Sequence, residues 1–369
     1  MSDLDNVHDA VERLEWDERK EDDNPFKRWR QFTRRSALTG GAAGLAALAL
    51  EACGSSSSGT TSKAATGGGS SAASIFGGSG GYKFTMVNHV TTNPFFAPTQ
   101  TGASDACKLL GCSYQWTGSQ TSNVSEMVNS LNSAVSAGVS GIAVSLVDQT
   151  AFNSPVAKAI SGGIPVVAYN ADVTGNPRLA YIGQDLYKSG QLLGQRIAQL
   201  VPSGDVAMFI ATPGSLNIQP RINGALAALK ATPSITPHVV ASGAAVPQEL
   251  STIQAYAKGH PNTKGMFAVD AGSTQSVAQT IQQQGLKGKV KGGGYDLLGP
   301  TVTLLHDGYI QVTIDQQPYL QGFLPILQLY MYKASGKITG IADVDTGLKL
   351  VDASTVAPYL SASAAKFTK

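Results

Sequence analysis

Cysteine, aromatic residues and charge are all scarce in this chain of 369 residues. It has three cysteines, 7% aromatic residues and 14% charged residues. Three cysteines exclude a small protein built from disulfides. The net charge of +2 gives no electrostatic basis for binding nucleic acid, because phosphate contacts need clustered lysine and arginine. Apolar residues at 42% and glycine at 41 positions are instead typical of an α/β protein with tight turns, and the length suits about two domains.

A hydrophobic run long enough to span a membrane is also missing near the amino terminus. The apolar stretch 37–50 is shorter than the roughly 20 residues that a transmembrane helix needs. It follows Arg34 and Arg35 and ends in small residues, so we expect residues 1–52 to be an export signal. The arginine pair resembles a twin-arginine signal, and it also fits the positive flank of an ordinary signal. Both interpretations take the protein out of the cytoplasm.

The end of this signal resembles a lipobox. The run Leu50-Glu51-Ala52-Cys53 would make Cys53 the lipid-modified first residue of the mature protein, although Glu51 departs from the usual neutral residue. Residues 54–81 are almost wholly Gly, Ser, Ala and Thr, a composition that buries too little apolar area to order itself. We therefore expect 53–82 to be a flexible tether between a lipid anchor at Cys53 and a folded module.

The remaining cysteines are Cys107 and Cys112, five residues apart. A disulfide between them and two buried thiols are equally compatible with this spacing, since spacing alone does not fix the Cα separation. The histidines indicate no metal site, because none stands at ligand spacing from another or from a cysteine. They are His8, His89, His238, His260 and His306.

From residue 83 onward, short apolar runs alternate with segments of helical periodicity. Between two such runs, Val124, Met127, Leu131 and Val135 share one face of an expected helix. Buried strands separated by helices predict parallel sheets covered on both faces, and the length suits two doubly wound sheets. The expected strands are 83–88, 142–146, 164–169, 206–210, 265–269, 290–295 and 311–314.

Polar residues recur directly after these runs. In parallel sheets, ligands collect at the carboxyl ends of the strands, where loops and helix amino termini converge. We therefore expect the residues that follow the strands to form a binding site. They include Asn93, Asn170, Asp172, Arg221, Asp270, Asp296 and Gln316.

In order and spacing, these residues resemble the type I periplasmic sugar-binding proteins, in particular the ribose- and galactose-binding group that feeds ATP-binding cassette importers. The resemblance spans about 83–349. Its motifs are Asn93-Pro94-Phe95-Phe96, Gly163-Ile164-Pro165-Val166-Val167, Arg221 three residues before Gly224, Asp270, Gly294-Tyr295-Asp296 and Gln316. It implies two Rossmann-like lobes with parallel sheets, joined by a three-crossing hinge and closing over a ligand.

Two departures from the family pattern bear on the ligand. The family's ribose binders carry Asp-Arg where this chain has Asn170-Ala171, and Asp172 is the expected substitute. Those binders also place a stacking aromatic near Ala244 and Ala245. We expect a roomier pocket here, with Trp116 as the replacement stacking face.

The resemblance and the strand ends together define the expected domains and site. The first lobe is 83–185 with 317–343 and the second is 186–316 with 344–369, with crossings near Asp185, Gln316 and Asp343. Of the phenylalanine pair, one ring is expected to face the cleft and the other to pack. The expected ligand-binding residues are Asn93, Phe95, Phe96, Trp116, Asn170, Asp172, Arg221, Asp270, Asp296 and Gln316.

The sequence therefore predicts an exported, lipid-anchored and monomeric binding protein that is not an enzyme and has no cofactor or metal. It would capture a small sugar, a cyclitol or a related polar ligand and deliver it to a membrane permease of the ATP-binding cassette type. A sensor that hands its ligand signal to a membrane kinase is the main alternative. An exported enzyme loaded with cofactor is a further one, but no nucleophile and base set or cofactor fingerprint supports it. A transcription regulator would share the fold, but an export signal stands where its DNA-binding helices would be.

Overall fold

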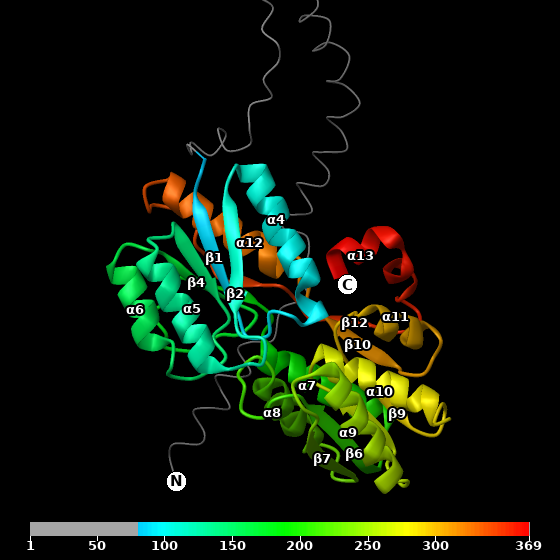
Figure 1. The fold of residues 1–369 in the computed structure, drawn as a ribbon. Helices are drawn as coiled ribbons and strands as arrows, with labels where there is room; N and C mark the ends of the chain where they lie inside the picture. Colours follow the sequence, from blue (N-terminus) through cyan, green and yellow to red (C-terminus); the bar gives the residue numbers. More distant parts are fainter. Residues whose placement is uncertain (1–79, 369) are drawn as a thin grey trace, which may run out of the picture. The chain divides into compact units, whose positions relative to one another are not determined.

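The computed structural model describes residues 80–368 (Figure 1). The expected export signal with Arg34 and Arg35, the anchor Cys53 and nearly all of the tether lie outside the described residues. The described residues form two α/β lobes within one compact unit, each built on a six-stranded sheet. This is the fold class that the alternating pattern predicts.

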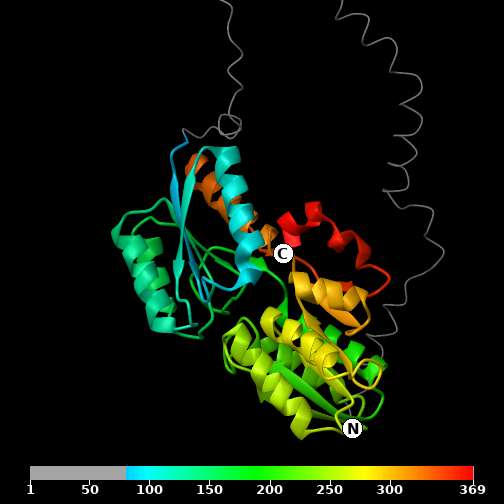
Figure 2. The ribbon, with the colours of Figure 1, turned by 45° about the vertical axis from the view of Figure 1, so that its right-hand side comes forward.

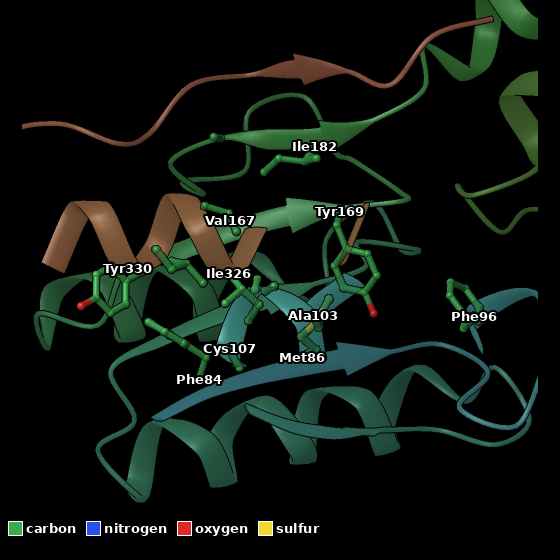
Figure 3. Close-up of a cluster of buried hydrophobic side chains, with 14 of the residues drawn as sticks. Phe84, Met86, Phe96, Ala103, Cys107, Val167, Tyr169, Ile182, Ile326 and Tyr330 are labelled. Carbon is green, nitrogen blue, oxygen red and sulfur yellow. The ribbon is translucent and has the colours of Figure 1, made fainter. Parts of the chain in front are cut away.

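The first lobe has the strand order β11-β5-β4-β3-β1-β2, all parallel. Alternate strand residues face opposite sides, so Met86 packs beneath α4 and α12 (Figure 3), while its neighbour Val87 packs beneath α5 and α6. Both faces are thus covered. The elements are β1 (Lys83–Asn88), α4 (Ala97–Leu110), β2 (Ser113–Gly118), α5 (Val124–Ser136), β3 (Gly141–Val144), α6 (Asn153–Ser161), β4 (Val166–Tyr169), β5 (Tyr181–Gly183), α12 (Leu320–Ala334) and β11 (Val344–Asp345).

The second lobe repeats this plan with the order β12-β10-β9-β8-β6-β7, in which only β12 is antiparallel. Helices α9, α10 and α11 cover one face and α7 and α8 the other, which Figure 2 shows from a second side. The elements are α7 (Leu186–Leu200), β6 (Gly204–Ile210), α8 (Gln219–Leu229), β7 (Ile235–Ala241), α9 (Val246–Gly259), β8 (Gly265–Ala268), α10 (Ala271–Gln283), β9 (Lys291–Tyr295), α11 (Gly299–His306), β10 (Val312–Asp315) and β12 (Lys349–Val351).

Three segments run between the lobes and are hydrogen-bonded to one another. Gln184, after β5, donates from Nε2 to the Gly347 carbonyl over 2.9 Å. The Thr346 hydroxyl donates to the Gln316 carbonyl over 2.8 Å. The third crossing follows β11, which pairs with β5, so it lies at 346–348, whereas the sequence places it near Asp343.

The carboxyl-terminal helix α13 (Ala362–Thr368) lies beside α4 of the first lobe (Figures 1 and 2). Lys366 pairs with Asp105 over 2.7 Å, and the Phe367 ring lies 4.8 Å from that of Tyr319. The sequence-based division assigns these residues to the second lobe. Apolar periodicity does not predict that the chain returns to the first lobe, because α13 buries no residue and meets that lobe through the ion pair and the aromatic contact named above.

Candidate ligand-binding site

A cavity lies between the lobes, at the carboxyl ends of their strands. Eight of the ten predicted ligand-binding residues line it, and Trp116 and Asp172 do not. The first lobe and the second lobe each supply one wall, and Gln316 comes from the second crossing. The lining residues are His89, Asn93, Phe95, Phe96, Asn170, Asn217, Ile218, Arg221, Asp270, Ala271, Asp296 and Gln316.

The apolar part of the first wall comes from a short 3-10 helix, η3 (Pro94–Phe96). The Asn93 side chain caps it by accepting a hydrogen bond from the Phe95 amide over 2.9 Å, so this residue shapes the loop as well as lining the cavity. The rings of Phe95 and Phe96 are 4.7 Å apart and inclined at 74°. Both rings line the cavity and both belong to the apolar core of the first lobe, so they do not divide the two tasks as expected.

Asn170 follows β4 and presents a free acceptor to the cavity. Its backbone is left-handed, with φ of 64°, a conformation that asparagine tolerates better than most residues. Its Nδ2 donates to Gln321 Oε1 over 3.2 Å, whereas the buried Oδ1 has no hydrogen-bond partner among the described residues. An unpartnered buried oxygen costs free energy unless a ligand donates to it.

Arg221 is held rigidly on the opposite wall, in the first turn of α8. It is 2% exposed, and its guanidinium lies 4.0 Å above the Tyr295 ring. Nη1 donates to the Val269 carbonyl over 2.9 Å and Nη2 to Gln184 Oε1 over 3.2 Å. The buried Nε has no partner among the described residues, which leaves a fixed donor for a ligand oxygen.

Asp270 and Asp296 supply the acidic part of the second wall. Asp270 caps α10, accepting from the Ser273 amide over 2.8 Å and the Ala211 amide over 3.1 Å. Asp296 has a left-handed backbone, with φ of 73°, and accepts from Gln316 Nε2 over 2.8 Å. Burial raises the pKa of both carboxyls, that of Asp296 to about 7, while the positive charge of Arg221 lowers each. One arginine therefore faces one buried acid, Asp296, and one half-buried acid, Asp270.

The two predicted residues outside the cavity have partners that the sequence did not indicate. Trp116 donates from Nε1 to the Thr91 carbonyl over 3.3 Å, and its ring lies 5.8 Å from that of Phe96, so it supports the wall from behind. Asp172 accepts from Arg178 Nε over 2.8 Å, in a separate pocket beside the crossings. A salt bridge to an arginine six residues further on has therefore turned this carboxylate away from the cavity.

Four lining residues were not predicted: His89, Asn217, Ile218 and Ala271. His89 directly follows β1, so the strand-end signal that identified the other residues also applies to it. Its ring contacts side chains of both lobes. Its Nδ1 contacts the Ser145 hydroxyl at 3.2 Å and its Nε2 contacts Asn217 Nδ2 at 3.0 Å. Burial lowers the pKa of His89 to about 3, so it is neutral at physiological pH. Asn217 precedes α8 in an irregular loop, where no periodicity marks it.

The described residues hold no group of three side chains suited to a metal ion. Cys107 and Cys112 are free thiols, with the Cys112 amide donating to the Cys107 carbonyl over 3.0 Å at the end of α4. None of the helices among residues 80–368 is sufficiently long and apolar to cross a membrane.

A two-lobed α/β fold with a polar cavity at the strand ends is typical of proteins that bind a small ligand. Residues 84–338 match the periplasmic binding protein domain family, and the chain belongs to that family. Its curated relatives include the xylose/arabinose-binding protein XylF of Sulfolobus acidocaldarius, 51% identical over 76% of this chain and 74% of the relative.

More distant proteins share the architecture. A D-ribose/D-allose-binding protein of Pseudomonas aeruginosa is 23% identical over 63% of this chain and 76% of that protein. The crystal structure of a solute-binding protein of an ATP-binding cassette transporter from Burkholderia graminis, in complex with D-arabinose, superposes with a TM-score of 0.71. It is 27% identical, over 76% of this chain and 99% of that structure. These relatives are named as binding proteins and not as enzymes.

Proposed function

We propose that this protein binds a monosaccharide, with pentoses of the xylose and arabinose type as the leading candidates, and delivers it unchanged to a permease of the ATP-binding cassette type. The names of the Sulfolobus relative and of the Burkholderia complex support the pentose assignment. The observation that carries sugar binding is the cavity itself, where Asn170 Oδ1 and Arg221 Nε are buried without partners in the part of the chain that the structure describes.

The chemistry of the walls suits a polyol. A sugar ring has apolar C–H faces and hydroxyls that both donate and accept hydrogen bonds. Phe95 and Phe96 offer a flat apolar surface, while Asn170 Oδ1 and the carboxylate of Asp296 accept from hydroxyls. Arg221 donates from a fixed position, which favours one ring orientation.

Calorimetry on a soluble form that starts after Cys53 tests the assignment. We expect D-xylose and L-arabinose to bind more tightly than D-glucose and myo-inositol. Arg221→Ala should weaken the binding at least about tenfold, near 1.4 kcal/mol, because it removes the buried donor. Arg196→Ala is the matched control, since Arg196 lies on the neighbouring α7 and bonds only Gln199 among the described residues. Failure of every sugar to bind, or equal affinity of both variants, would refute the proposed site.

We also propose that the protein leaves the cytoplasm through a twin-arginine signal, is anchored by lipid on Cys53 and acts as a monomer. The arginine pair, the lipobox-like run and the small-residue tether support this anchoring. Cys53→Ser should move the protein from the membrane fraction to the soluble fraction, and mass spectrometry of the mature amino terminus should show diacylglycerol only on the unaltered chain. A soluble, unmodified native protein would contradict the anchor.

A further inference from the structure

Glu249 is a buried acid that the sugar site described above does not include. It lies in the first turn of α9 and is only 2% exposed. Its carboxyl sits against the first turn of α10, where a Cβ on Gly272 would fall directly on Oε2. That oxygen receives no hydrogen bond from an amide or hydroxyl of the described residues. An isolated buried carboxylate is costly, so its surroundings must compensate for it.

The group that faces Glu249 is another acid. The Asp270 carboxyl, at the cap of α10, lies within hydrogen-bond reach of it, and the Ser273 hydroxyl is the other side-chain partner. Arg221 from α8 lowers the pKa of Asp270, and the Asp270 charge in turn raises the pKa of Asp296, which follows β9. Two carboxyls in contact cannot both be charged at low cost, so the pair holds one proton between them.

The surroundings decide which acid holds the proton. Asp270 accepts two backbone amides and feels the positive charge of Arg221, all of which favour its ionised form. Among the described residues, Glu249 has only the Ser273 hydroxyl as a donor and no cation acts on it. Burial and the adjacent Asp270 raise the pKa of Glu249 to about 9. At neutral pH Glu249 is therefore the hydrogen-bond donor and Asp270 the acceptor.

We propose that Glu249 is a positioning residue of the sugar site: in its protonated form it donates to Asp270 and fixes the carboxylate that faces the ligand. This inference rests on the proposed sugar-binding function. Asp270 lines the cavity whereas Glu249 stands behind it, so the effect on the ligand passes through Asp270. Glycine at 272 is part of the arrangement, because any side chain there would displace the Glu249 carboxyl.

The test is the pH profile of pentose affinity for the unaltered protein, Glu249→Gln and Glu249→Leu. For the unaltered protein we expect a constant Kd from about pH 7.5 to 8.5 and a rise above about pH 9, when Glu249 loses its proton. Glu249→Gln keeps a donor that does not titrate, so its Kd should lack the alkaline rise. Glu249→Leu has no donor and should bind at least tenfold more weakly at pH 7.5.

Glu126→Gln is the matched control. Glu126 stands in the first turn of α5 in the other lobe, is exposed and does not line the cavity. This variant should keep the alkaline rise of the unaltered protein. The inference is overturned if Glu249→Gln shows the same rise, or if Glu249→Leu binds as tightly as the unaltered protein.

Unfolding without sugar separates this inference from the proposed function. A carboxyl whose pKa is raised on folding binds a proton that the unfolded chain has already released, so stability falls as pH rises from about 5 to 9. The denaturation midpoint of the unaltered protein should fall relative to that of Glu249→Gln across this window. Absence of pentose binding with this difference intact would refute the function alone, and absence of the difference would refute the protonated pair.

Discussion

At the scale of a single residue, Asp296 is subject to opposing effects on its pKa. Its carboxyl is buried and its backbone is left-handed, while Gln316 and the charge of Arg221 stabilise the ionised form. Burial is the largest effect and raises the pKa to about 7, above the usual value of 3.8. The folded protein therefore holds a proton on Asp296 over a range of pH in which the unfolded chain has lost it. Ionising the buried Asp296 carboxyl therefore costs stability at neutral and alkaline pH, at a position in the cavity wall.

Replacing Asp296 by Asn removes this titration. The unaltered protein should lose stability as pH rises from about 4 to 7, whereas Asp296→Asn should lose less, by on the order of 2 kcal/mol. The variant should also bind pentose at least about tenfold more weakly at pH 8, since it has lost the carboxylate acceptor. Chemical denaturation at pH 4.5 and 8, with calorimetry at pH 8, measures both effects. Equal pH dependence of stability in the two proteins would contradict the raised pKa.

At the scale of elements, each lobe contains a pair of helices whose backbones approach closely at a glycine. A Cβ on Gly224 of α8 would fall on the Tyr187 carbonyl of α7, and one on Gly322 of α12 would fall on the Thr99 carbonyl of α4. Only a residue without a side chain allows such backbones to touch. The α7 and α8 contact bears on the cavity because Arg221, one turn before Gly224, is presented to the cavity by α8.

Gly224→Ala should therefore separate α7 from α8. We expect a loss of about 2 kcal/mol in unfolding free energy from overpacking, and weaker pentose binding because Arg221 moves with its helix. Gly259→Ala is the matched control, since Gly259 ends α9 and a Cβ there meets nothing within 4 Å. The control should keep its stability or gain up to about 1 kcal/mol from alanine's better helix propensity. If Gly224→Ala is as stable as Gly259→Ala, the close helix contact is not needed.

At the scale of the whole molecule, contacts across the cavity hold the two lobes together. The Leu216 amide of the second lobe donates to the Val147 carbonyl of the first over 3.0 Å, close to the His89 and Asn217 pair. Ala271 and Leu298 from the second lobe also pack into the apolar cluster of the first. The structure therefore has the lobes in contact, and any separation of the lobes must break these hydrogen bonds.

The alternating apolar runs by themselves determined the two-sheet architecture and the end of each sheet at which the cavity lies. A run such as that of β6 encodes burial on both faces, and in parallel sheets the strand ends converge whatever their partners are, so Asn93, Arg221 and Asp270 were predictable. The order and spacing of these residues along the chain also indicated the family.

Only the tertiary structure decided which side chains pair. Asp172 bonds Arg178 instead of lining the cavity, His89 meets Asn217 across 128 positions, and Glu249 meets Asp270 between two helices. Periodicity records which side of an element is buried, but a polar contact depends on the positions of atoms brought together from distant segments. The sequence therefore predicts most of the residues that line the cavity. The charge state of the cavity, and the polar atoms that lack partners among the described residues, arise from packing.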